Sequence, residues 1–249
     1  MSLQIAALPG VPEVLPGDDL GALLASAAGR LDPPGLEPDD VVVVVHKAVA
    51  KAEGRVVALG DVTPGARAAA LAAEHGKDPR LVELILAESA EIVRADAGRF
   101  ICRTRHGFVC ANAGVDASNT SEPDSLVLLP LDPDASARAL RARLPSHPAV
   151  VITDSFGRAW RQGQCEIAIG IAGLAPLEDW RGRPDTAGRE LNATIIAIAD
   201  EAAAAADLVR AKDSREPAVR LRGLERHVTS EDGPGVSALV RRPEDDLFR

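Results

Sequence analysis

Two short segments of the sequence concentrate side chains that could bind a metal ion or a phosphate. The first runs from His106 to Asn119 and contains small residues followed by Asp116 and, three positions later, Asn119. Aspartate is a hard oxygen ligand that suits Mg²⁺ or Mn²⁺, and small residues let the backbone approach a ligand closely. A polar turn capped by Asp and Asn has the same pattern, and the residues alone favour this turn.

The second segment runs from Thr153 to Gly163. In it Asp154 and Ser155 follow a predicted buried strand, and open sheets usually bind ligands at this end of their strands. A carboxylate beside a hydroxyl can form a pair of metal ligands, and Arg158 and Arg161 could clamp a phosphate or a carboxylate. An N-cap followed by two surface arginines around a packed tryptophan would look the same, so both interpretations stay open.

Cations follow a run of five valines at 41–45. His46 and Lys47 come directly after it, and Lys51 lies one helical turn beyond Lys47 if this segment is a helix. The lysines could hold phosphates, although solvated lysines are the more common outcome, and His46 could contact a nucleotide or be a core histidine. With two aspartates at separate strand ends, and no covalent nucleophile beside a base, the set suits metal-assisted phosphoryl transfer.

The elements that must position these side chains alternate between strands and helices without a strict rhythm. Apolar and β-branched runs predict strands at 41–45, 126–131, 149–153 and 218–221, with short strands between 91 and 110. Capping aspartates and Asp-Pro pairs predict helices over 18–29, from 79 onward and over 133–144. Apolar residues at helical spacing predict that the longest helix spans 191–212.

Composition excludes several classes of function. The chain has 249 residues and a net charge of −9, which disfavours bulk attraction to nucleic acid or anionic membranes. It has no tyrosine, two tryptophans and four phenylalanines, too few for a nucleic-acid stacking platform. Three cysteines without a C-x-x-C pair indicate free thiols in a reducing compartment. With no signal peptide and no membrane-length apolar run visible, we expect a cytoplasmic protein.

Motifs of common nucleotide and hydrolase sites are also missing. The chain has no P-loop, no G-x-G-x-x-G after a strand, no nucleophile elbow and no H-E-x-x-H. A nucleotide would therefore be held by an uncommon fold.

The quoted segments resemble the coenzyme F420-0:L-glutamate ligase family, also called F420:γ-glutamyl ligase. The similarity is nearly continuous from Leu8 to about Leu224 and most specific between His106 and Asn119; it includes LPGVPE at 8–13, KAVAKAEGR at 47–55, DPR at 78–80, DSFGR at 154–158 and DLFR at 246–249. The resemblance implies an α+β fold of mixed sheets and helices in an intertwined homodimer. It implies one module over 1–249 with two interleaved lobes and a tail at 230–249, without the nitroreductase-like domain of some relatives.

The resemblance also implies a reaction. GTP phosphorylates the terminal carboxylate of F420-0, and the α-amine of L-glutamate attacks the acyl phosphate, releasing phosphate and GDP. The product then accepts a further glutamate in γ-linkage. Mg²⁺ or Mn²⁺ is required, and K⁺ is associated with the family. The alternative that the residues leave open is a metal-dependent phosphatase or nucleotide hydrolase using the same carboxylates.

Site residues follow from the resemblance position by position. Asp116 and Asp154 resemble catalytic metal ligands, with Ser155 as a hydroxyl ligand. The positions that resemble GTP contacts are Val11, Pro12, Glu13, Val14, His46, Lys51, Asn119 and Lys212, and the substrate-binding candidates are Arg158 and Arg161. His46 replaces a usual Ser or Thr, and Lys212 stands where a Gln ligand is expected. Because a charged lysine cannot bind a metal, Lys212 would instead touch phosphate.

Overall fold

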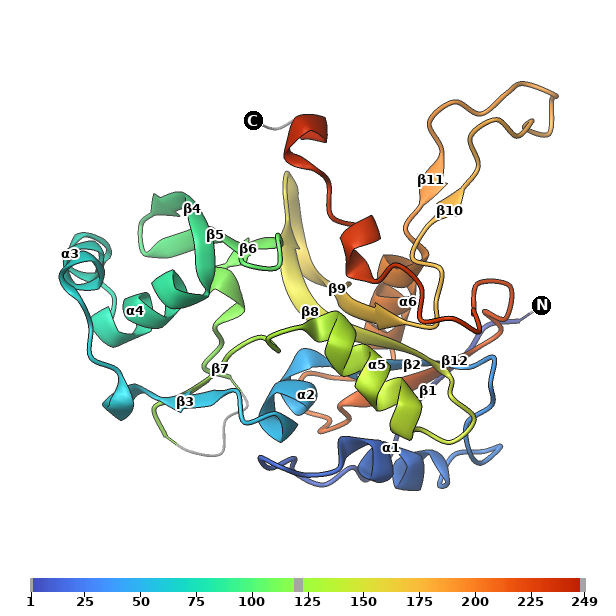
Figure 1. Ribbon diagram of the computed structural model, residues 1–249, viewed down its shortest axis with the longest axis horizontal. Coiled ribbons are helices and arrows are strands. Elements are labelled where there is room, and N and C mark those ends of the chain that lie inside the picture. Colours follow the sequence, from blue (N-terminus) through green and yellow to red (C-terminus); the bar gives the residue numbers. More distant parts are fainter. Residues whose placement is uncertain (1, 119–122, 247–249) are drawn as a thin grey trace.

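The computed structural model describes residues 2–118 and 123–246. The α-helices in these ranges are α1 (Leu20–Ala28), α2 (His46–Ala52), α3 (Ala66–His75), α4 (Pro79–Glu88), α5 (Pro133–Arg143) and α6 (Ile198–Asp207). The strands are β1 (Gln4–Ala7), β2 (Val41–Val45), β3 (Val56–Ala58), β4 (Ser89–Asp96), β5 (Arg99–Thr104), β6 (Val109–Ala111), β7 (Ser125–Val127), β8 (Ala149–Arg158), β9 (Arg161–Ala172), β10 (Glu178–Asp179), β11 (Ile195–Ile196) and β12 (Ala218–Arg222). Helices and several mixed or antiparallel sheets make this an α+β protein, as the family resemblance implies (Figure 1).

The largest sheet has five strands in the order β1-β12-β2-β8-β9. The first four valines of β2, at its centre, have no exposed surface, because β-branched side chains pack on both faces. β2 runs parallel to β8, whereas the other neighbours are antiparallel. α5 and α6 pack against β8 and β9, with α5 in front of the sheet and α6 behind it in Figure 1. This sheet therefore forms the main hydrophobic core.

A second hydrophobic core lies between β3 and β7 in the sequence. There the sheet β4-β5-β6 lies beside α3 and α4, on the left of Figure 1, and fully buried residues such as Ile85 and Phe100 fill the space between them. The chain enters this part through β3 and leaves it through β7, and the two strands pair antiparallel. Asp116, which pairs with Val127 of β7, is thus tied to the second core.

Aspartate side chains begin three helices, as the sequence predicts. Asp19, Asp78 and Asp132 accept hydrogen bonds from backbone N–H groups in the first turns of α1, α4 and α5. These bonds satisfy donors that have no partner within the helix. The strands expected at 41–45 and 218–221, and the short strands between 91 and 110, are confirmed as well.

Two of the predicted strands end at other residues than the sequence predicts. The one expected at 126–131 is strand only up to Val127, and the chain reaches Pro130, which has no N–H, soon afterwards. The one expected to end before Asp154 continues to Arg158, because β8 pairs with β9 in a hairpin whose register runs from Val150 opposite Ala172 to Arg158 opposite Arg161. Asp154 and Ser155 therefore lie within a strand and not after its end.

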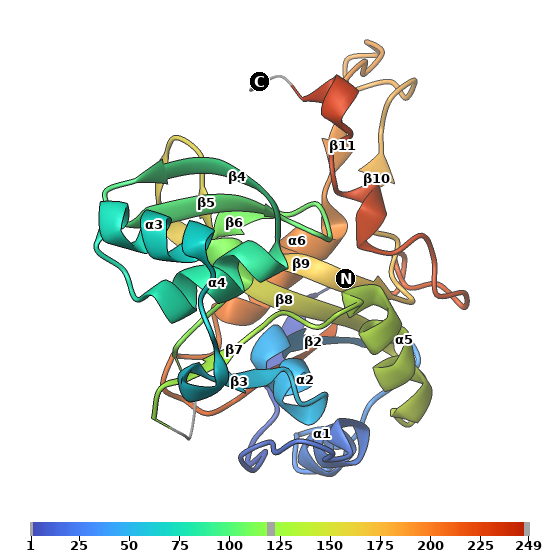
Figure 2. The ribbon, with the colours of Figure 1, turned by 60° about the vertical axis from the view of Figure 1, so that its left-hand side comes forward.

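The helix predicted over 191–212 is wrong at both ends. Only 198–207 is helical, where alanines dominate. Residues 178–196 form an arm closed by the β10–β11 pair, which projects from the rest of the molecule in Figures 1 and 2. Beyond α6 the chain turns away at Leu208, whose side chain is exposed. The longest described helix is α5 instead.

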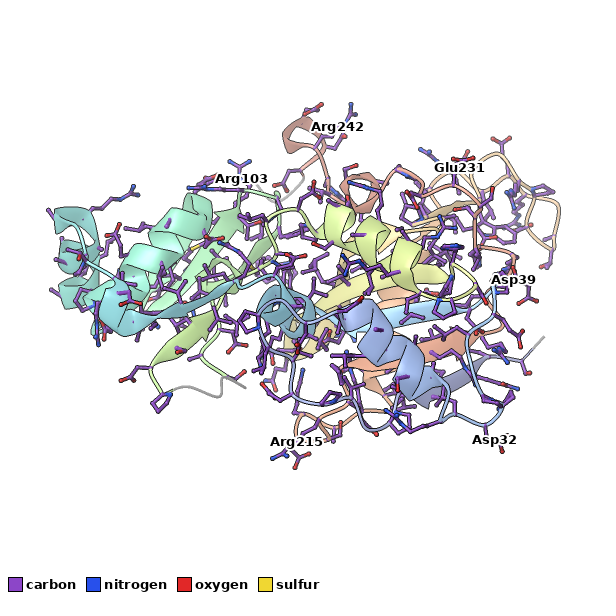
Figure 3. All side chains as sticks on the ribbon, turned by 60° about the horizontal axis from the view of Figure 1, so that its bottom comes forward. Asp32, Asp39, Arg103, Arg215, Glu231 and Arg242 are labelled. Atoms are coloured by element: carbon purple, nitrogen blue, oxygen red, sulfur yellow. The ribbon has the colours of Figure 1, made fainter. Side chains whose placement is uncertain are left out.

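Charged side chains cover much of the surface. The labelled Asp32, Asp39, Arg215 and Arg242 project from its periphery in Figure 3. None of the helices in the described part of the chain has the length and apolar character that crossing a bilayer requires.

Candidate functional site

The start of α2 lies beside Asp154. β2 passes into α2 without an intervening loop, and Val45 pairs with Thr153 of the parallel strand β8. The next residues, His46 and Asp154, therefore meet: His46 Nε2 lies 3.2 Å from Asp154 Oδ1. The histidine is 2% exposed, and neither ring nitrogen makes a hydrogen bond within the described residues. His46 is thus a buried partner of the carboxylate and not a surface residue.

The second residue of α2 reaches the other predicted aspartate. Lys47 Nζ lies 2.7 Å from Asp116 Oδ2 and 2.5 Å from Ser118 Oγ. Asp116 Oδ1 also accepts a hydrogen bond from the Ser118 N–H. Burial acts to raise the pKa of the Asp116 carboxyl, but the hydrogen bonds from Lys47 and Ser118 outweigh it and hold the pKa below its ordinary value. Asp116 is therefore ionised at neutral pH.

Asp116 and Asp154 thus meet consecutive residues of one helix, although they come from different parts of the fold. Asp116 pairs with Val127 of β7 beside the second core, whereas Asp154 belongs to the main sheet. The expectation that each follows a strand end is wrong for Asp154, for the reason given above.

A second group of charges lies across the β8–β9 hairpin. Ser155 stands opposite Glu166 in the register and donates a hydrogen bond to its Oε1. Lys212 Nζ lies 2.5 Å from Ser155 Oγ and 3.4 Å from Glu166 Oε1, and Arg210 Nη2 lies 3.3 Å from Glu166 Oε2. The Ser155 N–H donates to Asp154 Oδ1, so the two groups of charges are contiguous.

Glu166 and Arg210 were not among the residues that the sequence indicated. Glu166 is 2% exposed and begins the apolar run 167–172 of β9. A carboxylate at the edge of such a buried run is uncommon unless it is paired, and this was the signal that could have identified it. For Arg210, the sequence carries no comparable signal.

Several buried polar atoms of this region make no hydrogen bond among the described residues. His46 Nε2, Glu166 Oε2 and Arg210 Nη2 lie in the ion pairs described above, whereas the atoms without a described partner are His46 Nδ1, Thr153 Oγ1 and Arg210 Nη1. Leaving such an atom unsatisfied costs about 1–3 kcal/mol, so native structures usually supply a water, an ion or a ligand. Their concentration here fits a site that takes up polar ligands.

The predicted metal ligands carry the right donor atoms for Mg²⁺ or Mn²⁺. Asp116, Asp154 and Ser155 offer carboxylate and hydroxyl oxygens, which these hard cations prefer. Within residues 2–118 and 123–246, no three His, Cys, Asp or Glu side chains form a ready cage. Mg²⁺ is commonly held by one or two carboxylates together with substrate phosphates, so the donor set fits an ion that arrives with a nucleotide.

The predicted nucleotide contacts near the N-terminus are tied to α2. Lys51 Nζ lies 2.5 Å from Glu13 Oε1, so the turn that contains Pro12 and Glu13 is linked to this helix. Val11 and Val14 are buried in the main core, which leaves their backbone as the part that could meet a ligand. Asn119 lies outside the residues that the structure describes.

The two predicted substrate arginines lie apart from this region. Arg158 and Arg161 are exposed at the far end of the β8–β9 hairpin, where Arg158 donates to the backbone oxygen of Gln162. Trp160 between them is 89% exposed, so the interpretation of a packed tryptophan is wrong. No described contact joins the arginines to Asp116, Asp154 or Lys212.

Cys110 is a buried thiol near enough to Asp154 to sense its charge, and it is unsuited to nucleophilic chemistry. Burial, helped by the negative charge of Asp154 and by Cys102, raises the pKa of Cys110 to about 12. The thiol therefore stays protonated at neutral pH, whereas the thiolate is the reactive form. This agrees with a site that works by positioning and charge.

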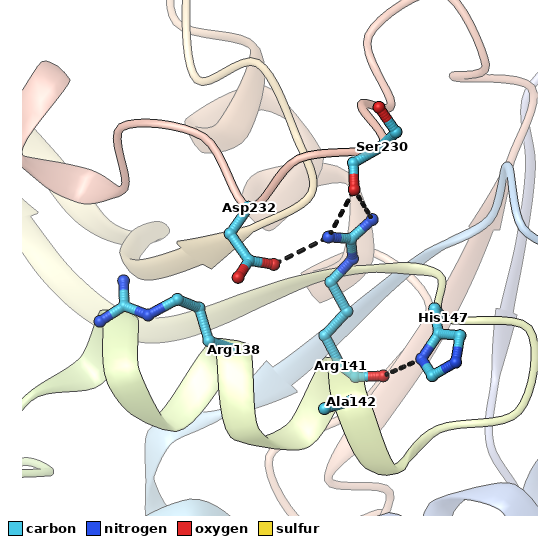
Figure 4. A pocket seen from close by; sticks show the side chains of 6 residues that line it. All are labelled: Arg138, Arg141, Ala142, His147, Ser230 and Asp232. Atoms are coloured by element: carbon cyan, nitrogen blue, oxygen red, sulfur yellow. Dashed lines mark hydrogen bonds and ion pairs between the residues drawn. The ribbon is translucent and has the colours of Figure 1, made fainter.

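A separate pocket lies between α5 and the segment predicted as the C-terminal tail. Arg141 donates to Asp232 Oδ1 and to the backbone oxygen of Ser230, while Arg138 and His147 lie beside them (Figure 4). None of the predicted site residues lines this pocket. Its contacts fasten the tail to α5, so we assign it a structural role.

Comparison with known proteins gives a consistent result over the whole chain. A family model described as F420-0:Gamma-glutamyl ligase matches residues 10–223. The chain is 44% identical over 254 residues to the coenzyme F420:L-glutamate ligase of Methanopyrus kandleri, covering 100% of this chain and 98% of that protein. It is 42% identical over 255 residues to the enzyme of the same name from Methanothermobacter thermautotrophicus, with both chains fully covered. It is 41% identical to the one from Haloarcula marismortui, covering 99% of this chain and 96% of that protein.

Proposed function

Because this chain belongs to the F420-0:gamma-glutamyl ligase family, we propose that it joins L-glutamate to coenzyme F420-0 in the biosynthesis of coenzyme F420. The observation that carries this proposal is the meeting of Asp116 and Asp154 with the first two residues of α2. Two carboxylates, a hydroxyl and several cations at one place suit phosphoryl transfer, in which positioning and charge neutralisation supply most of the catalysis.

We propose that GTP activates the substrate. A free carboxylate is a poor electrophile, so its terminal oxygen first attacks the γ-phosphate of GTP, which gives an acyl phosphate and GDP. The neutral α-amine of L-glutamate then attacks the acyl carbon, and the carbon–oxygen bond to phosphate breaks. The amide forms as phosphate leaves and the amine nitrogen loses one proton, keeping its other N–H in the amide. The F420-1 product would accept a second glutamate through its γ-carboxylate in the same way.

The residues of the site divide this work. Asp116, Asp154 and Ser155 would hold Mg²⁺ or Mn²⁺, which supplies neutralising charge to the phosphates when it is bound. His46 keeps the Asp154 carboxylate in place, and Lys47 does the same for Asp116. The remaining residues proposed to contact GTP are Val11, Pro12, Glu13, Val14, Lys51, Asn119 and Lys212.

Mass spectrometry tests the proposed reaction directly. F420-0 is incubated with the protein, GTP, Mn²⁺ and L-glutamate, and we expect F420-0 to gain one or more glutamyl residues while GDP appears. Samples without glutamate or without GTP serve as controls. GTP turnover that is indifferent to glutamate and leaves F420-0 unchanged would contradict the ligase and indicate a nucleotide hydrolase. The association with K⁺, the cytoplasmic location, the homodimer and substrate binding by Arg158 and Arg161 stay predictions.

A further inference from the structure

The ammonium group of Lys212 lies next to two oxygens of the candidate site. Its Nζ lies 2.5 Å from Ser155 Oγ and 3.4 Å from Glu166 Oε1. The side chain is 71% exposed, whereas that of Glu166 is 3% exposed. The ammonium group thus covers a buried carboxylate from the solvent side.

Arg210 already neutralises this carboxylate. Its side chain is 5% exposed, and it lies 3.3 Å from Glu166 Oε2 and 3.8 Å from Asp207 Oδ1. The buried guanidinium fastens the segment after α6 to the hairpin and balances the charge of Glu166. The charge of Lys212 is therefore additional, and it is directed to Ser155 and the edge of Glu166.

Resting on the function proposed above, we propose that Lys212 is a tethered cation that takes the place of one divalent metal ion beside Ser155 and Glu166. A hydroxyl and a carboxylate oxygen side by side are ligands that Mg²⁺ or Mn²⁺ would otherwise accept. An ammonium group has three donors and no lone pair, so it excludes a metal from the same oxygens. Two donors face Ser155 and Glu166, which leaves the third for a phosphate oxygen on the solvent side.

Counting bound Mn²⁺ tests this proposal without measuring activity. Electron paramagnetic resonance follows free Mn²⁺ in titrations of the wild type, K212Q and K212M, with Mn²⁺ alone and with a non-hydrolysable GTP analogue. We expect both variants to bind one more Mn²⁺ per chain than the wild type, and K212Q to bind it at least tenfold more tightly than K212M. K77Q removes the same charge far from the site and should match the wild type.

A further substitution identifies where the added ion binds. Replacing Ser155 by Ala in the K212Q background should weaken the additional Mn²⁺ at least tenfold, because it removes a shared ligand. Equal Mn²⁺ counts in the wild type and both Lys212 variants would overturn the proposal, and so would an added ion that is insensitive to Ser155. The count does not depend on the reaction: a gain of Mn²⁺ in a protein that fails to add glutamate to F420-0 would refute the ligase and leave this inference standing.

Discussion

Asp154 combines a buried histidine partner with a carboxylate that stays partly exposed. Its Oδ1 faces His46 Nε2 and accepts the Ser155 N–H, and its side chain is 15% exposed. We therefore expect the carboxylate to supply charge for the ligand more than packing for the core. The negative charge of Asp154 also helps to raise the pKa of Cys110.

We expect D154N to lose most of its activity while it keeps its fold. Removing the charge weakens metal binding, so kcat should fall by about 100-fold or more, with little change in the thermal midpoint. The measurement is kcat at saturating Mg²⁺ together with a melting curve. D61N changes an exposed aspartate in the same way and serves as the control. An unchanged kcat in D154N would remove this residue from the site.

Lys51 could bind a phosphate of GTP or only hold the turn at 11–14, and two variants separate these roles. K51A should raise KM for GTP about tenfold with a smaller change in kcat, because a cation near the nucleotide is lost. The Lys51–Glu13 pair suggests a comparison with E13Q. If Lys51 binds phosphate and Glu13 meets GTP only through its backbone, E13Q frees Lys51, and KM for GTP should stay constant or fall. If Lys51 only holds the turn at 11–14, both variants should raise KM equally, and the phosphate contact would be wrong.

Among the elements, the β8–β9 hairpin carries most of the site. It holds Asp154, Ser155 and Glu166 in one register, and α5 packs tightly on it at Gly170. A Cβ atom added to Gly170 would lie 2.4 Å from the backbone oxygen of Pro133, a contact that no rotamer can relieve. The close approach of α5 therefore requires glycine at this position.

We expect G170A to lower the free energy of unfolding by about 1–3 kcal/mol, because α5 must shift away from the sheet. G157A on the same hairpin is the matched control, since nothing lies within 4 Å of the added methyl group. Urea denaturation of both variants measures the difference. Equal stability of G170A and G157A would show that α5 adapts without cost.

Local signals explain which elements could be predicted from the sequence. A capping aspartate bonds to the backbone two or three residues further along, and a run of valines favours a strand at its own position. For this reason α1, α4, α5 and β2 were predictable. The continuation of β8 depends on its partner β9, and polar residues after Thr153 conceal it. The end of α6 depends on the burial of Arg210 against Glu166, which a periodic pattern cannot contain.

The same distinction applies to the site. Asp116, Asp154, Ser155 and His46 were candidates from their residue types and spacing as well as from the family resemblance, and Lys212 from the resemblance alone. The structure places them in contiguous contacts. Glu166 escaped notice because its role depends on a cross-strand neighbour. Arg158 and Arg161 lie at the end of the same hairpin without a described contact to these residues, so substrate binding by them stays a prediction.

At the scale of the whole molecule, the site joins two hydrophobic cores. Lys47 belongs to a helix whose Ala48 and Val49 are part of the main core, while Asp116 follows Val115 of the second core. The ion pair between Lys47 and Asp116 therefore bridges them. A ligand held by both aspartates would bridge them as well.

The ion pair between Lys47 and Asp116 predicts that the free energy of unfolding depends on pH. The pKa of Asp116 is lowered, so its stabilising contribution is complete above the ordinary aspartate value of 3.8 and is lost as the pH falls through the lowered value. In K47M burial remains and the main hydrogen bond is gone, so we expect the pKa to rise above that of the wild type. Carboxyl carbon chemical shifts recorded against pH measure it. A pKa unchanged by K47M would show that Lys47 does not hold the charge.

The direct passage from β2 into α2 has a consequence for the evolution of the chain. One residue inserted between Val45 and His46 would rotate the helix by about 100° relative to the sheet, because 3.6 residues complete a turn. His46 would then lose its contact with Asp154, and Lys47 its contact with Asp116, at the same time. Insertions and deletions at this junction should therefore be far rarer among descendants of this gene than substitutions, since a change of length there dismantles both halves of the site at once.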